Sequence, residues 1–355
     1  MIAQPIRLSL LKVCLARIFI RSAALLFAFP AAALAHEKWF FSGSPPATQW
    51  RTLLQPGPLV VMTLVAILAV SAGFLQKRLM KREWIPGPRA FGATPESLAL
   101  FYGLTPAILA LHLSVPLFIY SVSGQMFSPN HLLETGVRNW IGLVEVGVAL
   151  AFFYGALTRF AAAFLGLIWL AGFFVLGWEA ALENAIYLGF AGFFFAAGRG
   201  PISIDRLLFP RLQPSISWQN AALSLLRTGV GVSLIVVAFT EKLANPALAL
   251  SFLHQYPLNF TPALGIPMSD QTFVLCAGAV ELLVGVLILC GFFTRSVILV
   301  AWVPFNLTLT IFDTTELVGH LPFYGAMAIL LVWSPYRNDK ELWIHGLRGS
   351  KPALS

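Results

Sequence analysis

The sequence predicts an all-α polytopic membrane protein, and three observations lead to this fold class. Of the 355 residues, 58% are hydrophobic and only 11% are charged, whereas a soluble domain carries about 25% charged residues. The apolar residues gather in runs of roughly 15 to 24 residues, close to the ~20 that cross a bilayer as a helix. The basic residues gather in alternate gaps between these runs, as in loops on one side of a membrane. Membrane orientation therefore accounts for the net charge of +8, and no nucleic-acid partner is indicated.

Residues 1–35 have the features of a cleavable signal peptide. Four basic residues between Arg7 and Arg21 precede a short apolar stretch, and Ala33-Leu34-Ala35 has the small-x-small pattern of a cleavage site. The apolar stretch is too short to span a bilayer comfortably. We therefore expect His36 to be the mature N-terminus, at the start of a periplasmic segment covering residues 36–57.

A histidine at a mature N-terminus presents an amine and an imidazole side by side. Imidazole nitrogen suits copper and zinc, so His36 is a candidate metal ligand and copper a candidate cofactor. The alternative is that His36 begins an exported tail whose aromatic residues, Trp39 and Phe40, rest at the membrane interface.

Nine apolar segments are the predicted transmembrane helices, and their loops indicate an orientation. Fourteen Lys and Arg residues fall on one side of this arrangement and four on the other. The positive-inside rule then predicts a multi-pass protein of the bacterial inner membrane, with a periplasmic N-terminus and a cytoplasmic tail, residues 336–355. The predicted spans are residues 58–75, 98–121, 139–157, 160–178, 184–198, 221–240, 272–292, 296–313 and 318–334.

The chain also contains an internal duplication. Val144-Glu145, Gly155 and Thr158-Arg159 match Val280-Glu281, Gly291 and Thr294-Arg295 at a constant offset of 136 residues. Upstream, Gln125 aligns with Lys242 at an offset of 117 residues. We therefore predict a degenerate four-helix repeat at residues 98–200 and a second at 221–335, with 58–75 as an extra transmembrane helix. Because each copy has an even number of spans, the two copies should be parallel, related by an axis along the membrane normal.

Two carboxylates, Glu145 and Glu281, lie inside predicted spans at matching positions of the two copies. A charge at such a depth costs at least ~2.5 kcal/mol, so both side chains should face the bundle interior. Each either binds a ligand or a proton, or holds the bundle together through an interhelical hydrogen bond.

A second pair of ionisable residues stands at the start of the last span. Glu316 and His320 are four residues apart, hence on one helical face, and Asp313 precedes them in the same turn. Such a pair suits metal binding or proton transfer through an imidazole tuned by its carboxylate. The last spans of both copies, 184–198 and 318–334, are short, which in repeat-built membrane proteins indicates a binding site.

Glu241 and Lys242 end the first helix of the second copy. They either form an exposed ion pair of little energetic value, or join Glu281 and His320 at one outer cavity, with the long loop 247–270 as its lid. On the second interpretation the candidate residues form two sets. The catalytic set is Glu281, His320 and Glu316, and the ligand-binding set is Glu241, Lys242, Glu145 and Asp313.

The second copy resembles the DoxX family of small four-helix bacterial membrane proteins. The residues that carry the resemblance are Arg227, Gly231, Glu241-Lys242, Glu281, Gly291, Thr294-Arg295 and His320-Leu321-Pro322. It covers residues 221–335 well and 98–200 weakly. Relatives include the DoxD-like subunit of thiosulfate:quinone oxidoreductase and members of oxidative-stress complexes, which implies redox work beside the quinone pool. The chain differs from this pattern in its duplication and in the exported His36–Phe40 segment.

Three functions remain open on these grounds. The first is a redox-associated subunit that binds quinone between helices, exchanges protons through Glu281 and His320, and works with a periplasmic or membrane redox partner protein. The second is a copper-handling membrane protein that uses His36 and other outer histidines. The third is a scaffold subunit without activity of its own, so whether the chain is an enzyme is left undecided.

Overall fold

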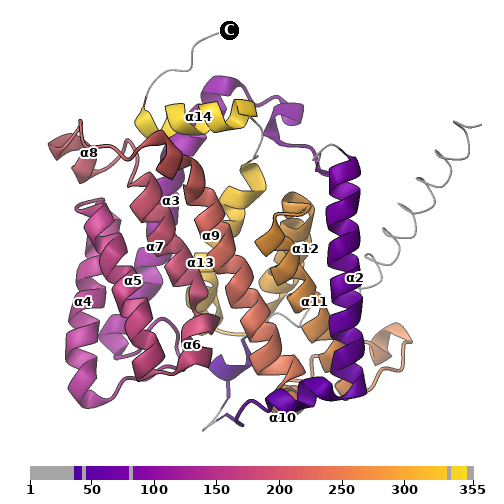
Figure 1. Cartoon of the computed structure of the whole chain (residues 1–355). Coiled ribbons are helices and arrows are strands. Elements are labelled where there is room, and N and C mark those ends of the chain that lie inside the picture. The colour runs from indigo at the N-terminus through magenta and orange to yellow at the C-terminus, as the bar shows by residue number, and fades with distance from the viewer. Residues whose placement is uncertain (1–35, 42–44, 80–82, 334–336, 350–355) are drawn as a thin grey trace, which may run out of the picture.

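The computed structural model describes residues 36–41, 45–79, 83–333 and 337–349. The predicted signal peptide, residues 1–35, lies outside the described residues. Regular structure in the described part of the chain is helical, which confirms the predicted all-α fold class (Figure 1). The longer helices are α2 (Pro56–Arg78), α3 (Pro95–Ser123), α4 (Thr135–Tyr154), α5 (Thr158–Val175), α7 (Ala185–Ala197), α9 (Ile216–Val237), α11 (Asp270–Cys290), α12 (Thr294–Thr308) and α13 (Thr314–Val332).

Shorter elements close the two ends of the bundle. They are the helices α6 (Trp178–Glu183), α8 (Ile204–Leu208), α10 (Pro246–Gln255) and α14 (Arg337–Arg348), the π-helical turn η4 (Ala238–Leu243), and the 3-10 turns η1 (Glu37–Trp39), η2 (Trp50–Leu54), η3 (Pro88–Phe91) and η5 (Pro262–Leu264). We call the end that carries η1 and α10 the head end, and the end that carries α8 and α14 the tail end (Figure 1).

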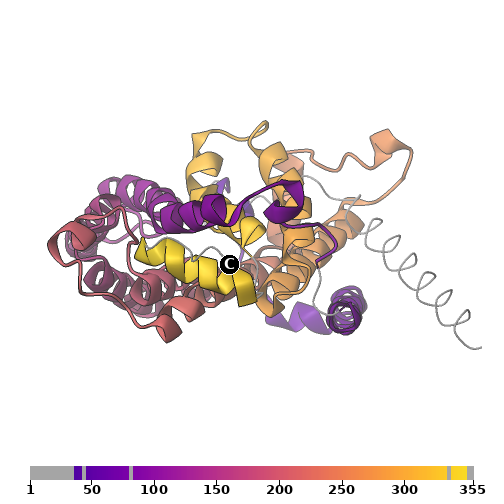
Figure 2. The same cartoon turned by 90° about the horizontal axis from the view of Figure 1, so that it is seen from above.

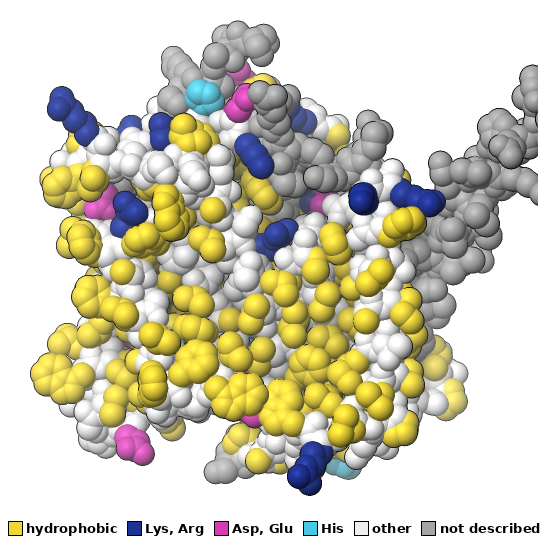
Figure 3. Space-filling model, viewed as in Figure 1, with side chains coloured by type: hydrophobic (Ala, Val, Ile, Leu, Met, Phe, Trp, Pro, Cys, Tyr) yellow, Lys and Arg dark blue, Asp and Glu magenta, His cyan; other side chains and the backbone are white. Residues whose placement is uncertain are grey.

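Seven helices in the described residues are long and apolar enough to cross a membrane, α9 being continued by η4. Hydrophobic side chains cover the flank of the bundle, while Lys and Arg gather mainly towards the tail end (Figure 3). Backbone polar groups must be satisfied within the chain in a bilayer core, and helices do this. The protein is therefore a multi-pass membrane protein.

The lengths of the last helices differ from the prediction in the second copy. The short segment expected at 184–198 is present as α7, which has 13 residues. The segment expected to be short at 318–334 is α13, with 19 residues, because the helix begins at Thr314 under an Asp313 cap. The shorter helix is instead α12, which ends at Thr308 after 15 residues.

The helices form two groups that pack against each other. One group is α3, α4, α5 and α7, and the other is α9, α11, α12 and α13; α7 packs on α9 and α13 on α3, while α2 lies outside against α11. Seen from the tail end, the purple and magenta helices of the first group lie on the left and the orange helices of the second on the right, and α14 packs mainly on α3 (Figure 2). In this arrangement the last helix of each group contacts the first helix of the other.

Two close helix contacts follow the offsets of the duplication. A Cβ placed on Gly229 of α9 would lie 2.6 Å from the Cα of Gly189 in α7, and a Cβ on Gly325 of α13 would lie 2.6 Å from the Cβ of His112 in α3. Gly325 follows Gly189 by 136 residues and Gly229 follows His112 by 117, the same offsets as in the sequence. This correspondence favours two parallel repeats, and the division of the chain into such domains stays a prediction.

The repeated Thr-Arg pair has a structural role at two equivalent helix starts. The backbone N–H of Thr158 donates to a carboxylate oxygen of Asp205 at 2.8 Å, and that of Thr294 donates to Glu83 at 3.1 Å. A carboxylate at a helix N-terminus satisfies free N–H groups and complements the helix dipole. Acids from two tail-end loops thus cap α5 and α12.

The arginines of these pairs close the ends of the neighbouring helices. The Nε of Arg159 donates to the carbonyl of Phe195 at 3.0 Å, and that of Arg295 donates to the carbonyl of Leu331 at 2.9 Å. The last carbonyls of a helix lack intrahelical donors, and basic side chains near them are stabilising. The Thr-Arg motif therefore marks the turn between helices, and the candidate chemistry lies at the other end of the bundle.

Candidate functional site at the head end

Residues His36–Phe40, which we call the head segment, enter the bundle at the head end. His36 and Glu37 are only 6% and 5% exposed, although sequence alone also allowed an exported tail at the interface. The segment forms the 3-10 turn η1. Its burial brings an imidazole, a carboxylate and an ammonium group into contact with helices more than a hundred residues away in the chain.

Glu241 of η4 holds the head segment in place. One of its carboxylate oxygens lies 3.4 Å from Nδ1 of His36, and the other accepts the backbone N–H of Glu37 at 2.5 Å. Glu241 is 1% exposed. A buried carboxylate requires compensating partners of this kind, because an unpaired charge would cost several kcal/mol.

Lys242 pairs with two carboxylates from different segments. Its Nζ lies 3.1 Å from Glu281 of α11 and 3.6 Å from Glu37 of the head segment. Lys242 and Glu281 are 1% and 2% exposed. The carboxylate inside the predicted span, Glu281, is therefore paired across helices, in the arrangement that the sequence suggested for it.

A π-helical turn allows both neighbours, Glu241 and Lys242, to face inwards. Successive residues of an α-helix point about 100° apart, since a turn takes 3.6 residues. In η4 the backbone widens over Ala238–Leu243, and both side chains are buried. Single π-helical turns within α-helices are frequent at functional sites.

Lys38 connects the head segment to α6, which contacts both α5 and α9. Its ammonium group pairs with the carboxylate of Glu183 in α6, which also accepts the hydroxyl of Thr240 at 2.5 Å. Thr240 belongs to η4, so one carboxylate contacts the head segment and the continuation of α9 together. The head segment is thereby bonded to α6 and to η4.

These residues form one continuous set, which we call the buried charge cluster. Its members are His36, Glu37, Lys38, Glu183, Glu241, Lys242 and Glu281. Four carboxylates face two ammonium groups and one imidazole, so the cluster carries excess negative charge unless protons are bound. A buried net charge is strongly unfavourable, and the cluster is neutral when His36 is protonated and one carboxyl is protonated.

The head segment supplies the groups that take up these protons. Burial lowers the pKa of His36, but the hydrogen bond to Glu241 and its negative charge outweigh burial and leave the pKa above the ordinary 6.5. Burial raises the pKa of Glu37 to about 8, and Glu241 and Glu281 act in the same direction against Lys242. The cluster is therefore balanced when His36 is charged and Glu37 is neutral, the two forms that these shifts favour.

Docking of the head segment is expected to weaken as the pH rises. Both pKa values are raised in the docked state, so the stabilisation is complete below the undocked values and is lost as pH passes through the docked ones. For Glu37, whose pKa moves from 4.5 to about 8, the docking equilibrium should fall roughly tenfold per pH unit within that window. Hydrogen exchange of the Glu37 amide, measured from pH 5.5 to 8.5 with correction for intrinsic rates, tests this.

A Glu37→Gln variant is the matched control for that measurement. It removes the titrating carboxyl while keeping the shape, so its corrected exchange should change less with pH, the remaining slope coming from His36. Equal slopes in the wild-type protein and this variant would show that Glu37 does not govern docking.

Beside the cluster lies a second arrangement, which we call the histidine pocket. Nδ1 of His320 is 3.2 Å from Glu316, both residues are completely buried, and neither makes a hydrogen bond with good geometry to a described group. Aromatic rings surround the imidazole, with centroid distances of 4.5 Å to Phe305 and 5.0 Å to Trp39. The imidazole Nε2 is thus a buried polar atom without a partner among the described residues.

The imidazole of His36 links the histidine pocket to the buried charge cluster. Its ring centroid lies 5.4 Å from that of His320 and 4.1 Å from that of Trp39, against which it stacks. A cavity of about 20 Å³, enough for one water molecule, lies beside His36, Glu241 and His131. Burial, together with the charge of Lys38, lowers the pKa of His131 to about 4. The imidazole of His131 is therefore neutral at neutral pH.

A comparison with known protein families matches the part of the chain that contains Glu241, Lys242 and Glu281. Residues 222–314 match the family model of DoxX. The chain carries a DoxX domain. No curated protein and no solved structure is significantly similar to the chain.

The DoxX domain supplies part of the site, and other segments complete it. The matched residues include Glu241, Lys242 and Glu281 and end at the first residue of α13, before Glu316 and His320. The head segment and Glu183 also lie outside the domain. The family resemblance drawn from the second copy is therefore confirmed, while the complete constellation depends on segments beyond the matched residues.

Two of the predicted site residues lie apart from the buried charge cluster. Glu145 is fully buried in α4 and accepts a hydrogen bond from Ser121 at 3.2 Å, without an ion pair among the described residues. Asp313 is exposed and caps α13, its carboxylate accepting the N–H of Thr315 at 2.8 Å. Their contacts are those of an interhelical hydrogen bond and a helix cap, and give neither residue a place at the proposed ligand site.

Four further residues lie at the site and were not among the candidates predicted from sequence: Glu37, Lys38, Trp39 and Glu183. A signal was available: three ionisable residues precede two aromatic ones in a segment that is expected to leave the membrane. What was missing was the partner of each charge, which only the folded chain provides. The loop 247–270 also differs from the expected irregular lid, because it contains α10, which contacts η1 and packs on α11.

Proposed function

We propose that this DoxX-like protein is a redox-associated membrane subunit that binds a quinone head group at the histidine pocket. The observation that carries the proposal is the fully buried His320, with an unpartnered Nε2, a carboxylate at 3.2 Å and aromatic rings around it. Aromatic walls with a few well-placed polar groups are typical of cofactor sites.

Quinone chemistry requires the groups that the pocket provides. Reduction of a quinone to a quinol takes up two electrons and two protons, one proton at each carbonyl oxygen. Nε2 of His320 exchanges a proton at one oxygen, and Glu316 orients the imidazole and stabilises its charged form. His36 and the buried charge cluster hold further protons next to this ring. The electrons come from a redox partner protein.

Room for the quinone ring is made by displacement of Trp39. The indole packs directly over Gly319, since a Cβ on that glycine would lie 2.2 Å from the Trp39 ring. The cavity beside it holds no more than one water. The head segment therefore acts as an exchangeable occupant of the pocket, and the quinone ring takes the place of the indole beside His320.

The proposed site faces the periplasm. Lys and Arg residues gather towards the tail end (Figure 3), and the positive-inside rule assigns such an end to the cytoplasm. The head end would then lie on the side where an exported redox partner is found. This supports an inner-membrane location with a periplasmic mature N-terminus.

The test measures quinone directly and through turnover. Organic extraction of the detergent-purified protein should yield quinone, and His320→Gln and Glu316→Gln should reduce bound quinone and quinone-dependent electron transfer at least tenfold. Glu281→Gln should retain bound quinone and slow turnover. Glu134→Gln, at an exposed carboxylate of the same end, is the matched control and should behave as wild type. If the purified protein contains no quinone, and His320→Gln and Glu281→Gln leave the phenotype unchanged, the quinone proposal is wrong. The scaffold function is then favoured.

Copper binding is the second candidate, favoured by the proximity of His36 and His320. The donors as they stand do not fit an ion, because Nδ1 of His36 is directed to Glu241 and no group of three or more His, Cys, Asp or Glu residues in the described ranges is placed to hold one. Elemental analysis of metal-replete wild type against His36→Ala decides the matter, and equal copper contents would exclude the role predicted for His36.

A further inference from the structure

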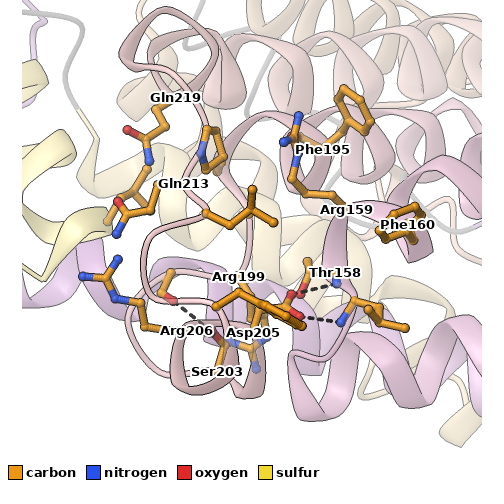
Figure 4. A pocket seen from close by; sticks show the side chains of 18 of the residues that line it. Thr158, Arg159, Phe160, Phe195, Arg199, Ser203, Asp205, Arg206, Gln213 and Gln219 are labelled. Atoms are coloured by element: carbon orange, nitrogen blue, oxygen red, sulfur yellow. Dashed lines mark hydrogen bonds between the residues drawn. The ribbon is translucent and has the colours of Figure 1, made fainter.

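A cavity of about 530 Å³ opens at the tail end, far from the histidine pocket. It lies between the start of α5, the end of α7 and the segment 198–214, which contains α8 (Figure 4). Its volume is in the range of small-molecule sites, ~300–1,000 Å³. We call it the tail-end cavity, and the proposed quinone function makes no use of it.

Three guanidinium groups line the tail-end cavity, from Arg159, Arg199 and Arg206 (Figure 4). The carboxylate in the lining is Asp205, and both of its oxygens accept backbone N–H groups, of Leu157 at 2.6 Å and Thr158 at 2.8 Å. The positive charges therefore exceed the negative ones, and the single carboxylate is committed to capping α5.

The arginines are held in place while retaining free donors. Arg199 is 7% exposed, and burial lowers its pKa to about 10, so it is charged at neutral pH. Arg159 lies flat over the ring of Phe195, with 4.7 Å from its central carbon to the centroid. Arg206 donates to the carbonyl of Arg348 at 2.8 Å. Because a guanidinium carries five N–H donors, each retains donors for a ligand.

A further donor in the cavity lacks a partner. Thr158 lines the cavity and is 1% exposed, and its buried Oγ1 makes no hydrogen bond among the described residues. A buried hydroxyl without a partner is destabilising. A ligand oxygen beside α5 would satisfy it, together with the neighbouring guanidinium groups.

The remaining lining is apolar and continuous with the flank of the bundle. Leu157, Phe160 and Leu212 line the cavity and are 58%, 65% and 74% exposed. Exposed apolar side chains at the end of transmembrane helices contact acyl chains, while basic residues at the same level attract anionic head groups. The ligand that fits both features is acidic at one end and apolar at the other.

We propose that the tail-end cavity binds an anionic glycerophospholipid from the adjoining leaflet. The phosphate accepts hydrogen bonds from the guanidinium groups of Arg199 and Arg206 and from the hydroxyl of Thr158, and the acyl chains pass over Leu157 and Phe160 to the flank. Guanidinium groups bind phosphate oxygens in pairs with favourable geometry. The excess positive charge of the lining then favours a lipid of net negative charge over a zwitterionic lipid, whose head group also carries a cation.

Native mass spectrometry of the detergent-purified full-length protein tests the proposal with phosphatidylglycerol and phosphatidylcholine added at equal concentration. The wild-type protein should retain phosphatidylglycerol at least tenfold better than phosphatidylcholine. Arg206→Gln and Thr158→Val should each reduce that preference about threefold or more, and Arg206→Lys should retain part of it. Arg211→Gln, at an exposed arginine of the same segment outside the cavity, is the matched control and should leave retention unchanged.

Three results would overturn the inference. Equal retention of the two lipids, or equal loss of preference in Arg211→Gln and Arg206→Gln, would show that general surface charge governs binding. Displacement of the lipid by millimolar inorganic phosphate would identify a site for a free anion instead. Thermal unfolding of each variant checks that lost retention does not come from lost folding.

Discussion

Replacement of Lys242 by Met is expected to destabilise the protein by about 3–5 kcal/mol, because it leaves buried carboxylates without their cation. The ammonium group lies 3.1 Å from Glu281 and 3.6 Å from Glu37, and all three side chains are at most 7% exposed. Met keeps the length of the aliphatic stem, so the loss reports charge and not packing. Unfolding in denaturant, followed in detergent micelles by circular dichroism, measures the change.

The double variant Lys242→Met/Glu281→Gln separates pairing from burial. Removal of both charges abolishes the uncompensated carboxylate, so the double variant should be more stable than Lys242→Met alone, with a coupling energy of about 0.5–3 kcal/mol. Lys340→Met, at an exposed lysine of α14, is the control and should stay within about 0.5 kcal/mol of wild type. Additive effects of the two cluster substitutions would contradict the ion pair.

Substitution of Gly229 by Val is expected to separate α7 from α9. Even a Cβ at this position would lie 2.6 Å from the Cα of Gly189 and 2.8 Å from the carbonyl oxygen of Ala185. Both contacts are to backbone, which cannot move aside as a side chain can. Small residues let transmembrane helices approach closely, and overpacking of such a contact costs about 1–3 kcal/mol or more.

The clearest readout for Gly229→Val is the midpoint of thermal unfolding, accompanied by the yield of folded protein. Gly147→Val is the matched control, because Gly147 lies within α4 and a Cβ there meets nothing within 4 Å. The control should stay within a few tenths of a kcal/mol of wild type, because valine is no poorer a helix former than the glycine it replaces. Similar losses at the two glycines would show that the α7–α9 contact tolerates extra volume.

The sequence was sufficient to predict the helices and their apolar faces. Hydropathy runs and basic loops depend on local composition, and each of the nine predicted segments overlaps a helix of the structure. Seven helices of the described residues are long and apolar enough to cross a membrane. The ends of α12 and α13 were predicted less well, because the Asp313 cap and the turn before it are set by local hydrogen bonds. Composition does not encode those bonds.

The candidate site was predictable only where its residues belong to transmembrane helices. The cost of burying a charge placed Glu281 in the bundle interior, and one of the two interpretations of Lys242 put it beside Glu281. The two side chains are paired in the structure. The head segment was not joined to them, because His36 and Glu241 are separated by 205 positions and no periodic pattern links them. Contacts at such separation depend on how the two groups of helices pack.

The head segment also has a consequence for the order in which the protein is completed. It stands ahead of the membrane-spanning helices of the described residues, yet it contacts η4 through Glu241 and α13 through Gly319 and His320. Its binding place does not exist until α13, the last of these helices, has been inserted. The head segment must therefore wait for the last helix, so a docked head segment reports that membrane insertion of these helices is finished.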